Sequence, residues 1–340
     1  MLHQTLSFLL ILASCVVAPH QASWADQILR RRGPQGDLNK TVSPNTLKPV
    51  ASASLKKPAS SLYFIDTKTG WVIANNNLYA TTDGGTSWKK LNHRALTNCD
   101  KVVFASPNVG WLLCDQWTTR RRSNSVLSTT DGGRSWRQLL EVRSPIYTAS
   151  LLGENLGYVS SRWQPLKKTA NHGKQWTELD GMEGLNYIQF IDEKNACGYG
   201  GAIWRSSDAG EHWKQIVTYE QVDDLSTSSF IDANTGWIIG SKQLWRTTDG
   251  EKWRLVDGVP HPGEFVDIDF VSAKEGWLAT GDGSMLHSVD SGATWQVQTR
   301  LAIAPRAIRF VSNLNGCVLG ANGELLRSDD GGQNWHSVRL

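Results

Sequence analysis

The chain has 340 residues, of which 40% are hydrophobic, and its 35 Lys and Arg and 32 Asp and Glu give a formal net charge of +3. The positive excess is confined to one segment, because residues 26–58 carry seven basic and two acidic residues, whereas residues 59–340 carry 28 basic and 30 acidic residues. A slightly acidic domain lacks the basic footprint of nucleic-acid binding, so we expect no nucleic-acid partner.

The first 25 residues differ from the rest of the chain. Residues 6–18 are an apolar run of 13, which is too short to span a bilayer as a helix and is typical of a secretory signal. The polar stretch that follows predicts cleavage after Ala25. An alternative stays open, because residues 12–15 (Leu-Ala-Ser-Cys) resemble a bacterial lipoprotein box that would leave a lipid-anchored Cys15. Both alternatives place the mature protein outside the cytoplasm, in a periplasm, a thylakoid lumen or the extracellular space.

Residues 26–58 are rich in Ser, Pro, Asn and Lys and show little periodicity. This composition predicts a disordered leader. Its net charge of +5 also allows an electrostatic tether to anionic headgroups or to an acidic partner, and hence a peripheral membrane association.

One phrase returns seven times after this leader. It contains a small hydroxyl residue, an acid, a glycine and a tryptophan, as in Thr81-Thr82-Asp83-Gly84-Gly85-Thr86-Ser87-Trp88, and the closing tryptophans lie 48, 40, 37, 40, 42 and 40 residues apart. A period near 40 predicts stacked supersecondary units. The acidic position is occupied by Asp83, Asp131, Asn171, Asp208, Asp249, Asp290 and Asp330.

A second pattern runs in phase with the first. A Phe or Leu, a short polar turn and a Gly-aromatic pair precede each phrase, as in Phe230 followed by Gly236-Trp237. Each unit therefore contains four strand candidates, which in the fifth unit are residues 228–231, 236–239, 243–247 and 252–256. Four short antiparallel strands per unit are typical of a propeller blade. The sequence predicts an all-β, seven-bladed β-propeller over residues 59–340, with four-stranded antiparallel blades and most of the 16 Trp packed between them.

The acid phrase predicts a clipped turn rather than a reactive site. A carboxylate accepts backbone N–H bonds across its own turn, glycine supplies the left-handed conformation, and tryptophan covers the turn with apolar area. Seven equivalent copies favour this structural role. The fifth copy is one residue short, so its turn around Asp249 should be tighter than the others.

The cysteines suggest one disulfide. Cys99 and Cys114 flank a hairpin, and a register that places Phe104 opposite Val109 also places the two cysteines opposite each other. In the fourth and seventh units Cys197 and Cys317 take the aromatic position, in blades that are not adjacent, so we expect these thiols to be buried and free.

Catalytic constellations are missing from the sequence. It contains no nucleophile elbow, no His-Glu-x-x-His, no phosphate loop and no metal-ligand spacing. Acid pairs occur at Asp223-Asp224, in a loop, and at Asp267 with Asp269, on an inner strand, but neither has a partner base. We therefore expect a protein that is not an enzyme and that has no catalytic residue, metal or cofactor.

One position of the repeat carries a positive charge that the Asp turn itself does not require. The residue before the hydroxyl of each phrase is Ala80 and Ser128 in the first two units and a cation in the next five, where it is Lys168, Arg205, Arg246, His287 and Arg327. Equivalent positions lie at equal height around a propeller, so these side chains predict an arc of positive charge. The arc either docks an acidic protein segment, or each cation pairs with the neighbouring blade's carboxylate or lies over a Trp.

The second unit carries an insertion. Its extra residues lie in an expected loop, residues 116–124, that contains Trp117, Arg120, Arg121 and Arg122. Three arginines beside an aromatic could hold a partner, or could be a solvated loop tip.

The phrase is the Asp box, or bacterial neuraminidase repeat. Seven boxes with phased Phe and Gly-Trp elements, as in residues 270–277, resemble the photosystem II stability and assembly factor family over residues 61–340. The resemblance implies a seven-bladed, non-enzymatic assembly factor for a membrane complex, which faces the lumen in photosynthetic organisms. It also implies an arginine-rich surface, to which Lys168, Arg205, Arg246 and Arg327 correspond. The chain departs from the family at Ala80 and Ser128 and in its Ser/Lys/Pro leader.

Two functions of different class follow. The first is an exported, monomeric, non-catalytic scaffold that binds a protein partner through the arc and the arginine loop and assists the assembly or stability of a membrane or envelope complex. The alternative is a glycan-binding or sialidase-type glycoside hydrolase, because sialidases also carry Asp boxes. Against it, the chain shows no arginine triad with a Tyr-Glu pair, and sialidase rings have six blades.

Overall fold

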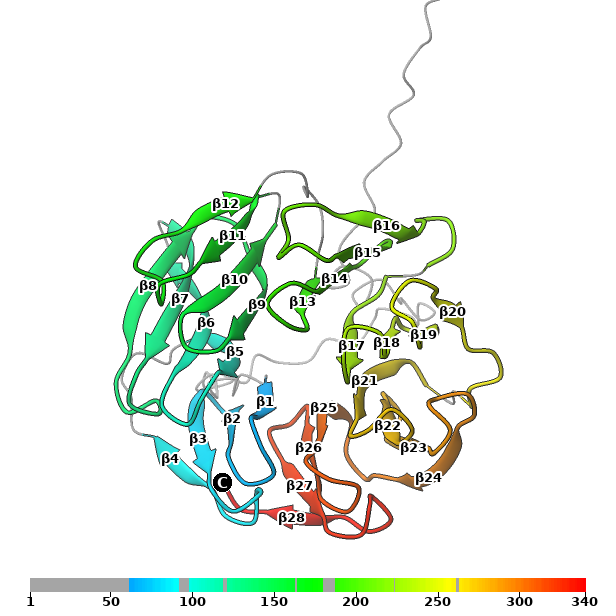
Figure 1. The fold of residues 1–340 in the computed structure, drawn as a ribbon. Coiled ribbons are helices and arrows are strands. Elements are labelled where there is room, and N and C mark those ends of the chain that lie inside the picture. The colour runs from blue at the N-terminus through cyan, green and yellow to red at the C-terminus, as the bar shows by residue number, and fades with distance from the viewer. Residues whose placement is uncertain are drawn as a thin grey trace, which may run out of the picture. The chain divides into compact units, whose positions relative to one another are not determined.

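Seven four-stranded antiparallel sheets follow one another around a central axis (Figure 1). The computed structural model describes residues 61–91, 98–118, 121–162, 164–179, 187–222, 224–260 and 263–340, and these contain 28 strands and no helix. The predicted seven-bladed β-propeller is confirmed. In the fifth blade the four expected strands are present, with ends that differ from the expectation by no more than two residues.

Each blade uses four consecutive strands. Blades 1 to 4 are β1 (Ser61–Phe64), β2 (Gly70–Ala74), β3 (Asn77–Thr81), β4 (Lys89–Leu91); β5 (Cys99–Phe104), β6 (Gly110–Thr118), β7 (Arg121–Thr129), β8 (Arg137–Val142); β9 (Ile146–Leu152), β10 (Leu156–Ser161), β11 (Leu166–Thr169), β12 (Thr177–Leu179); and β13 (Tyr187–Phe190), β14 (Ala196–Tyr199), β15 (Ile203–Ser206), β16 (Lys214–Val217). Blades 5 to 7 are β17 (Thr227–Phe230), β18 (Gly236–Ile239), β19 (Leu244–Thr247), β20 (Arg254–Leu255); β21 (Phe265–Phe270), β22 (Gly276–Thr280), β23 (Ser284–Ser288), β24 (Gln296–Arg300); and β25 (Pro305–Phe310), β26 (Gly316–Gly320), β27 (Leu325–Ser328), β28 (His336–Val338).

The ring closes between blades 7 and 1. Strand β1 contacts β25 on one side and β5 on the other, and each described sheet keeps its own four strands. The sequence left the mode of closure open. Residues 47–55, considered there as an additional outer strand, lie outside the described residues.

The core between blades is built from stacked aromatic rings. Trp71 of blade 1 stacks on Phe104 of blade 2 with ring centroids 3.5 Å apart. A stack of the same kind, between an aromatic residue of one blade and the Phe of the next, recurs at three further interfaces. Those pairs are Tyr158 with Phe190, Trp237 with Phe270, and Trp277 with Phe310, at 3.4, 3.4 and 3.7 Å. The phase relation between the Phe and the Gly-aromatic pair is therefore a packing relation between neighbouring blades.

The glycine of the Gly-aromatic pair is required by this stack. A Cβ on Gly110 would lie 2.5 Å from the ring of Phe104, which belongs to the same blade. The ring is thus held between its own blade's glycine and the preceding blade's aromatic residue. The Asp-box residue Trp136 completes the arrangement edge-on, with its centroid 6.2 Å from that of Phe104.

The Asp-box turns have the predicted form. In blade 2 the Asp131 carboxylate accepts hydrogen bonds from the Thr129 hydroxyl at 2.7 Å and from the backbone N–H of Ser135 at 2.9 Å, and Gly133 donates its N–H to the Thr129 hydroxyl at 2.9 Å. Partial burial opposes ionisation, but the bonds from Ser135 and Thr129 outweigh it and lower the pKa of Asp131 to about 2. The indole N–H of Trp136 donates to the Gly133 carbonyl at 3.1 Å, a bond that sequence reasoning did not anticipate.

The fifth turn is tighter, as its missing residue predicts. Asp249 accepts from the backbone N–H groups two and three residues later, at 3.0 and 2.7 Å, whereas Asp131 accepts from the fourth. In the third turn Asn171 replaces the acid, and its side-chain oxygen still accepts the N–H of Gln175 at 2.8 Å.

Cys99 and Cys114 face each other across β5 and β6 and are joined by a disulfide. The expected register was wrong by one residue at the other end of the hairpin, where Phe104 pairs with Gly110 instead of Val109. A bulge between Cys99 and Lys101 absorbs the difference, because one unpaired residue brings the cysteines back into opposition.

Candidate functional site

The cations of the predicted arc lie in the clefts between blades, near the Asp-box end of each third strand. Lys168 is 3.5 Å from Glu211 and Arg205 is 3.4 Å from Glu251, and both partners belong to the next blade's Asp box. Arg246 donates to the backbone carbonyl of Ser291, also in the next box, at 3.2 Å.

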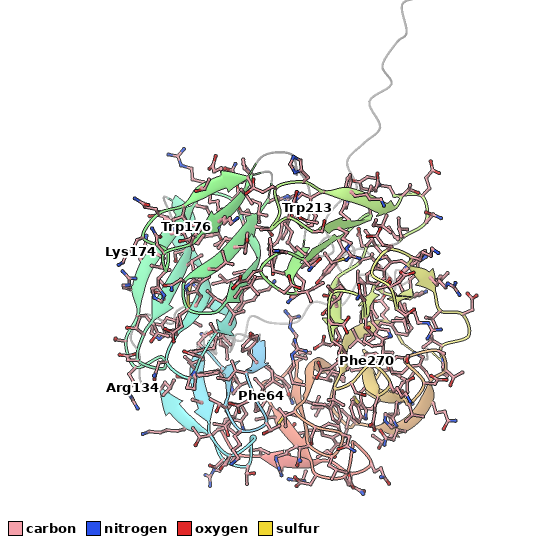
Figure 2. The ribbon with its side chains drawn as sticks, viewed as in Figure 1. Phe64, Arg134, Lys174, Trp176, Trp213 and Phe270 are labelled. Atoms are coloured by element: carbon pink, nitrogen blue, oxygen red, sulfur yellow. A yellow bond between two sulfur atoms is a disulfide. The ribbon has the colours of Figure 1, made fainter. Side chains whose placement is uncertain are left out.

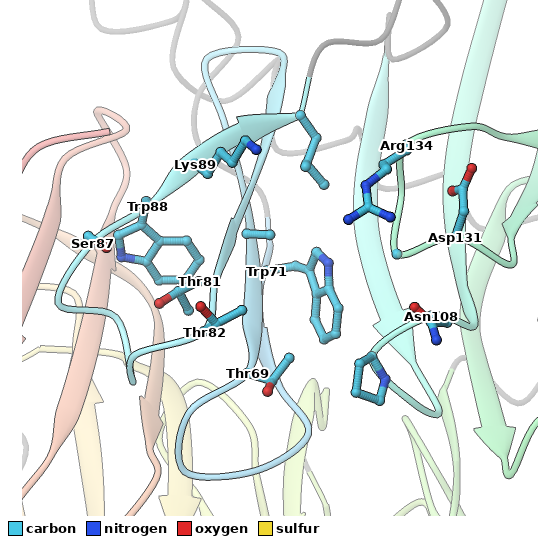
Figure 3. Close-up of a pocket in the computed structure, with 14 residues that line it drawn as sticks. Thr69, Trp71, Thr81, Thr82, Ser87, Trp88, Lys89, Asn108, Asp131 and Arg134 are labelled. Carbon is cyan, nitrogen blue, oxygen red and sulfur yellow. The ribbon is translucent and has the colours of Figure 1, made fainter.

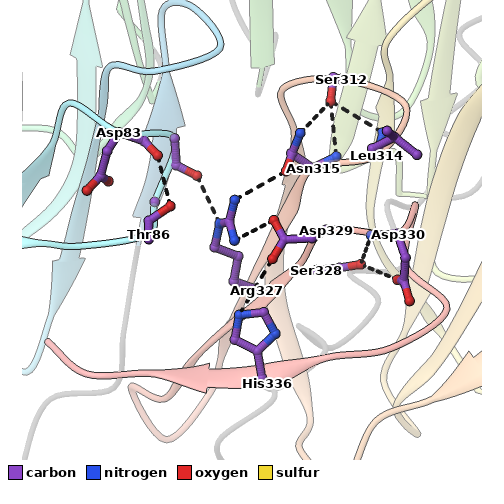
Figure 4. A network of polar contacts seen from close by, with 12 residues as sticks. Asp83, Thr86, Ser312, Leu314, Asn315, Arg327, Ser328, Asp329, Asp330 and His336 are labelled. Carbon is purple, nitrogen blue, oxygen red and sulfur yellow. Dashed lines mark hydrogen bonds and ion pairs between the residues drawn. The ribbon is translucent and has the colours of Figure 1, made fainter.

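The interface between blades 7 and 1 contains the same kind of contact between a cation and the next blade's Asp box. Arg327 donates from Nε to the Gly84 carbonyl of blade 1 at 3.3 Å and from Nη2 to Asn315 at 3.2 Å, and it also pairs with Asp329 (Figure 4). His287 is the exception: it contacts Glu275 at 3.1 Å and stacks on Trp277 within its own blade.

These contacts favour the inter-blade alternative that the sequence left open. The side chains of Lys168, Arg205, His287 and Arg327 are only 12–23% exposed. An arginine that is mostly buried and paired is a clamp between sheets, and it offers little surface to a partner.

Arg246 differs from the other cations because further positive charge surrounds it. Arg246 and Arg254 are directly opposed on β19 and β20, and with Lys252, Thr248 and Asp249 they line a polar depression of about 130 Å³. Like charges in opposed positions on neighbouring strands destabilise a sheet. No carboxylate among the described residues forms an ion pair with these three cations, and the Oδ1 atom of Asp249 is already held by its own turn. The basic depression in blade 5 is the part of the arc best suited to an anionic group.

The insertion in blade 2 is a longer hairpin rather than the expected loop. Strands β6 and β7 remain paired up to Thr118 and Arg121, and Trp117 pairs with Arg122. Arg120 and the side chains of Trp117, Arg121 and Arg122 lie outside the described part of the chain, as does Trp163.

The end of the hairpin and the arc position of the same blade lie at opposite ends of one strand. Ser128, at the arc position of blade 2, lies near the Asp-box end of β7, and Arg122 lies six residues away at the opposite end of the same strand. At about 3.3 Å per residue the two positions are separated by roughly 20 Å. A combined docking site for the arc and the arginines, as the sequence suggested, would have to span this distance and stays a prediction.

The acid pair on β21 is part of the inner-strand framework. Asp267 accepts the backbone N–H of Ile308 at 2.8 Å and pairs with Arg309 at 3.0 Å, and Asp269 accepts the N–H of Phe310 at 2.5 Å. Ser229 fills the place of Asp269 in blade 5 and bonds Phe270 in the same way at 3.0 Å. Both carboxylates thus join blade 6 to blade 7, and neither faces a base. Of the other acid pair, Asp223 lies outside the described residues.

Sequence reasoning missed a chain of polar contacts along the inner strands. Lys101 donates to the Tyr147 carbonyl and lies 5.6 Å from the ring centroid of Tyr187, which stacks on Tyr199. Ser228 donates to the Tyr199 hydroxyl at 3.0 Å. This chain links blades 2 to 5. The spacing of the residues does not reveal it, because all of its contacts except the stack of Tyr187 on Tyr199 are made between different blades.

The described part of the chain shows no group of three or more His, Cys, Asp and Glu residues placed to hold a metal. Cys197 and Cys317 are buried free thiols, and burial raises the pKa of Cys317 to about 12. Within the same ranges no helix has the length and hydrophobicity that crossing a bilayer requires.

Arg205→Glu should destabilise the propeller, because a carboxylate would then face Glu251 in a cleft where the native side chain is 17% exposed. We expect the free energy of unfolding to fall by about 1–3 kcal/mol in urea denaturation. Arg137→Glu, at an exposed position on β8, is the control and should change it by less than about 0.5 kcal/mol. Equal stability of the two variants would show that Arg205 is not a clamp.

Asp269→Asn should change how stability depends on pH. Burial raises the pKa of Asp269 to about 7, against the opposing effects of Arg309 and the Phe310 N–H. A folded-state pKa above the unfolded value stabilises the fold at low pH, and this contribution is lost as pH rises from about 4 to about 7. From about pH 5 to about pH 8 the native protein should lose on the order of a few kcal/mol relative to the variant, which keeps a neutral acceptor for Phe310. Parallel pH profiles of unfolding would contradict this.

One family model and several solved structures match this chain. The family model described as photosynthesis system II assembly factor YCF48 matches residues 245–340. A structure of YCF48 bound to D1 peptide has a TM-score of 0.64 and 24% identity, covering 80% of this chain and 93% of that one. YCF48 from Cyanidioschyzon merolae has a TM-score of 0.63 and 20% identity, covering 80% and 95%.

Enzymes share the architecture too. The GH74 xyloglucanase from Xanthomonas campestris has a TM-score of 0.64 with 12% identity, covering 82% of this chain and 52% of that one. No curated protein matches the chain. At these identities the solved structures show a common fold. The match over residues 245–340 adds sequence evidence, and together they confirm that this Asp-box propeller resembles the photosystem II assembly factor YCF48 family.

Proposed function

We propose that this protein is an exported, non-catalytic scaffold that binds an acidic segment of a membrane-complex subunit and assists the assembly of that complex, as a photosystem II assembly factor does. The observation that carries the proposal is the YCF48 family match over residues 245–340, together with the D1 peptide held by a YCF48 of the same fold. The basic depression in blade 5 lies within the matched residues.

The charge arrangement supports an acidic partner. Arg246, Lys252 and Arg254 hold three positive charges in one depression, and a carboxylate-rich segment would relieve their mutual repulsion. Outward-pointing cations elsewhere, such as Lys174 on blade 3, stand apart at the rim (Figure 2). Glycoside hydrolysis is less well supported, because Asp267 and Asp269 are engaged in inter-blade contacts rather than facing each other across an open site.

Binding of D1 peptides tests whether the partner is a photosystem II subunit. Overlapping fluorescent peptides that tile D1 should give a saturable change in anisotropy with the full chain, and the peptides that bind should be acidic. The double variant Lys252→Glu with Arg254→Glu should weaken binding by about tenfold or more. The matched control, Arg137→Glu with Lys174→Glu, reverses two exposed charges on other blades and should stay within about twofold. If no D1 peptide binds, the proposal that the partner is a photosystem II subunit is contradicted. If both double variants lose affinity equally, the proposal that the basic depression is the binding site is contradicted.

Export is supported by the apolar run at residues 6–18 and by the disulfide between Cys99 and Cys114, since disulfides persist in oxidising compartments. The N-terminus of the protein isolated from its native cells should begin at Asp26 if a signal peptidase cleaves after Ala25. A diacylated Cys15 at the N-terminus would instead establish a lipoprotein. Intact-mass spectrometry distinguishes the two, and a native protein that retains residues 1–25 in the cytoplasm would contradict export.

A further inference from the structure

The cleft between blades 1 and 2 is open where the corresponding cleft between blades 4 and 5 is filled. Ala80 occupies the position of Arg205, and the cavity beside it has a volume of about 380 Å³ (Figure 3). The cleft beside Arg205 retains only about 10 Å³. The guanidinium of Arg205 lies against Gly250 of the next box, whereas no blade 1 side chain lies within 4 Å of the equivalent position on Gly132. The short side chain of Ala80 therefore leaves a vacant clamp site.

A buried hydrogen-bond donor is left without a partner in this cavity. The indole N–H groups of Trp237 and Trp277 donate to backbone carbonyls of the following Asp box, Ser291 and Gly331, at 2.9 Å each. Trp71 holds the same position in blade 1, is 2% exposed and lines the cavity, but its Nε1 has no partner. An unpaired buried N–H costs about 1–3 kcal/mol, so a ligand that accepts from it would recover that energy.

Positive charge stands at the opening. Arg134 and Lys89 are exposed residues that line the cavity, and neither forms an ion pair with a carboxylate among the described residues. The Asp131 carboxylate is held by Thr129 and Ser135 within its turn. In Figure 3 it points away from Trp71, while the Arg134 guanidinium is directed toward the space beside the indole.

We propose that this cleft, the blade 1–2 slot, binds a carboxylate. The carboxylate would accept the Trp71 N–H and pair with Arg134, whose planar fork matches two carboxylate oxygens. The fixed negative charge of Asp131 disfavours a dianion such as phosphate more than a monoanion. Leu91, Trp88 and Pro107 add apolar wall, which suits the aliphatic part of an acidic side chain or a chain end. The slot is distinct from the basic depression of blade 5 and goes beyond the function proposed above.

The Trp71 indole N–H signal in a ¹⁵N-resolved NMR spectrum tests the slot directly. Trp71→Phe assigns that signal and keeps a ring to stack on Phe104. The probes are acetylated and amidated Gly-Ser-Glu-Ser-Gly, the same peptide with Gln for Glu, the Gln peptide with a free C-terminal carboxylate, and inorganic phosphate. We expect a saturable shift of the Trp71 signal with one or both carboxylate peptides and none with the capped Gln peptide. The peptide that acts identifies whether a side chain or a chain end is the source.

Two variants test whether the shift of the Trp71 signal comes from binding in the slot. Ala80→Arg should abolish the shift, because its long side chain would fill the cavity, as Arg205 fills the cleft between blades 4 and 5. Arg134→Gln, at an exposed position, should weaken binding by about tenfold. The Trp237 indole signal, which already has a partner, should stay unmoved in all titrations and reports that the fold is intact. No shift of Trp71 with either carboxylate peptide, a shift that survives Ala80→Arg, or a larger response to phosphate would each overturn the proposal. None of these outcomes depends on whether D1 peptides bind.

Discussion

The stack of an aromatic ring on the next blade's Phe is the contact on which the rest of the molecule depends. Trp71 on Phe104 and Trp237 on Phe270 bring flat faces together at 3.5 and 3.4 Å, and the glycine behind each Phe removes the Cβ that would separate the ring from its own sheet. Each blade thus packs its Phe against the preceding blade and its Gly-aromatic residue against the following one. A single sheet could not bury these rings, so each blade depends on its neighbours to cover them.

Polar contacts at the Asp-box end act on this frame in two ways. The carboxylates clip their own turns, and the cations before the box hydroxyl reach the following blade, as Arg205 and Arg327 do. The cleft that Arg205 enters retains only about 10 Å³. Where Ala80 stands, the same geometry produces an open cavity and an unpartnered indole. One substitution within a repeat therefore turns a structural contact into a site with binding capacity.

Binding capacity in a repeat protein is best sought where the repeat's own contacts are incomplete. Lys168 and Arg327 have partners inside the ring, and this accounts for their charge without any ligand. Arg246 bonds the Ser291 carbonyl of the next box, but it also lies opposite Arg254, and among the described residues neither forms an ion pair with a carboxylate. The unbalanced charge in blade 5 and the unpartnered Trp71 donor beside an open cavity in blade 1 are two independent departures from the contacts that other blades make.

The order of residues along the chain was enough to predict the blade count, the four strands of each blade, the turn role of Asp131 and its equivalents, and the tighter fifth turn at Asp249. These features are local or periodic, so spacing alone encodes them. It was not enough to place Arg205 in a cleft, to put Arg122 and Ser128 at opposite ends of one strand, or to show the bulge that aligns Cys99 with Cys114. Those outcomes depend on the distance between one blade and the next and on register within a sheet. The first is decided only when neighbouring sheets pack together, because the partner then lies about forty residues away, and the second only when the strands of one sheet pair.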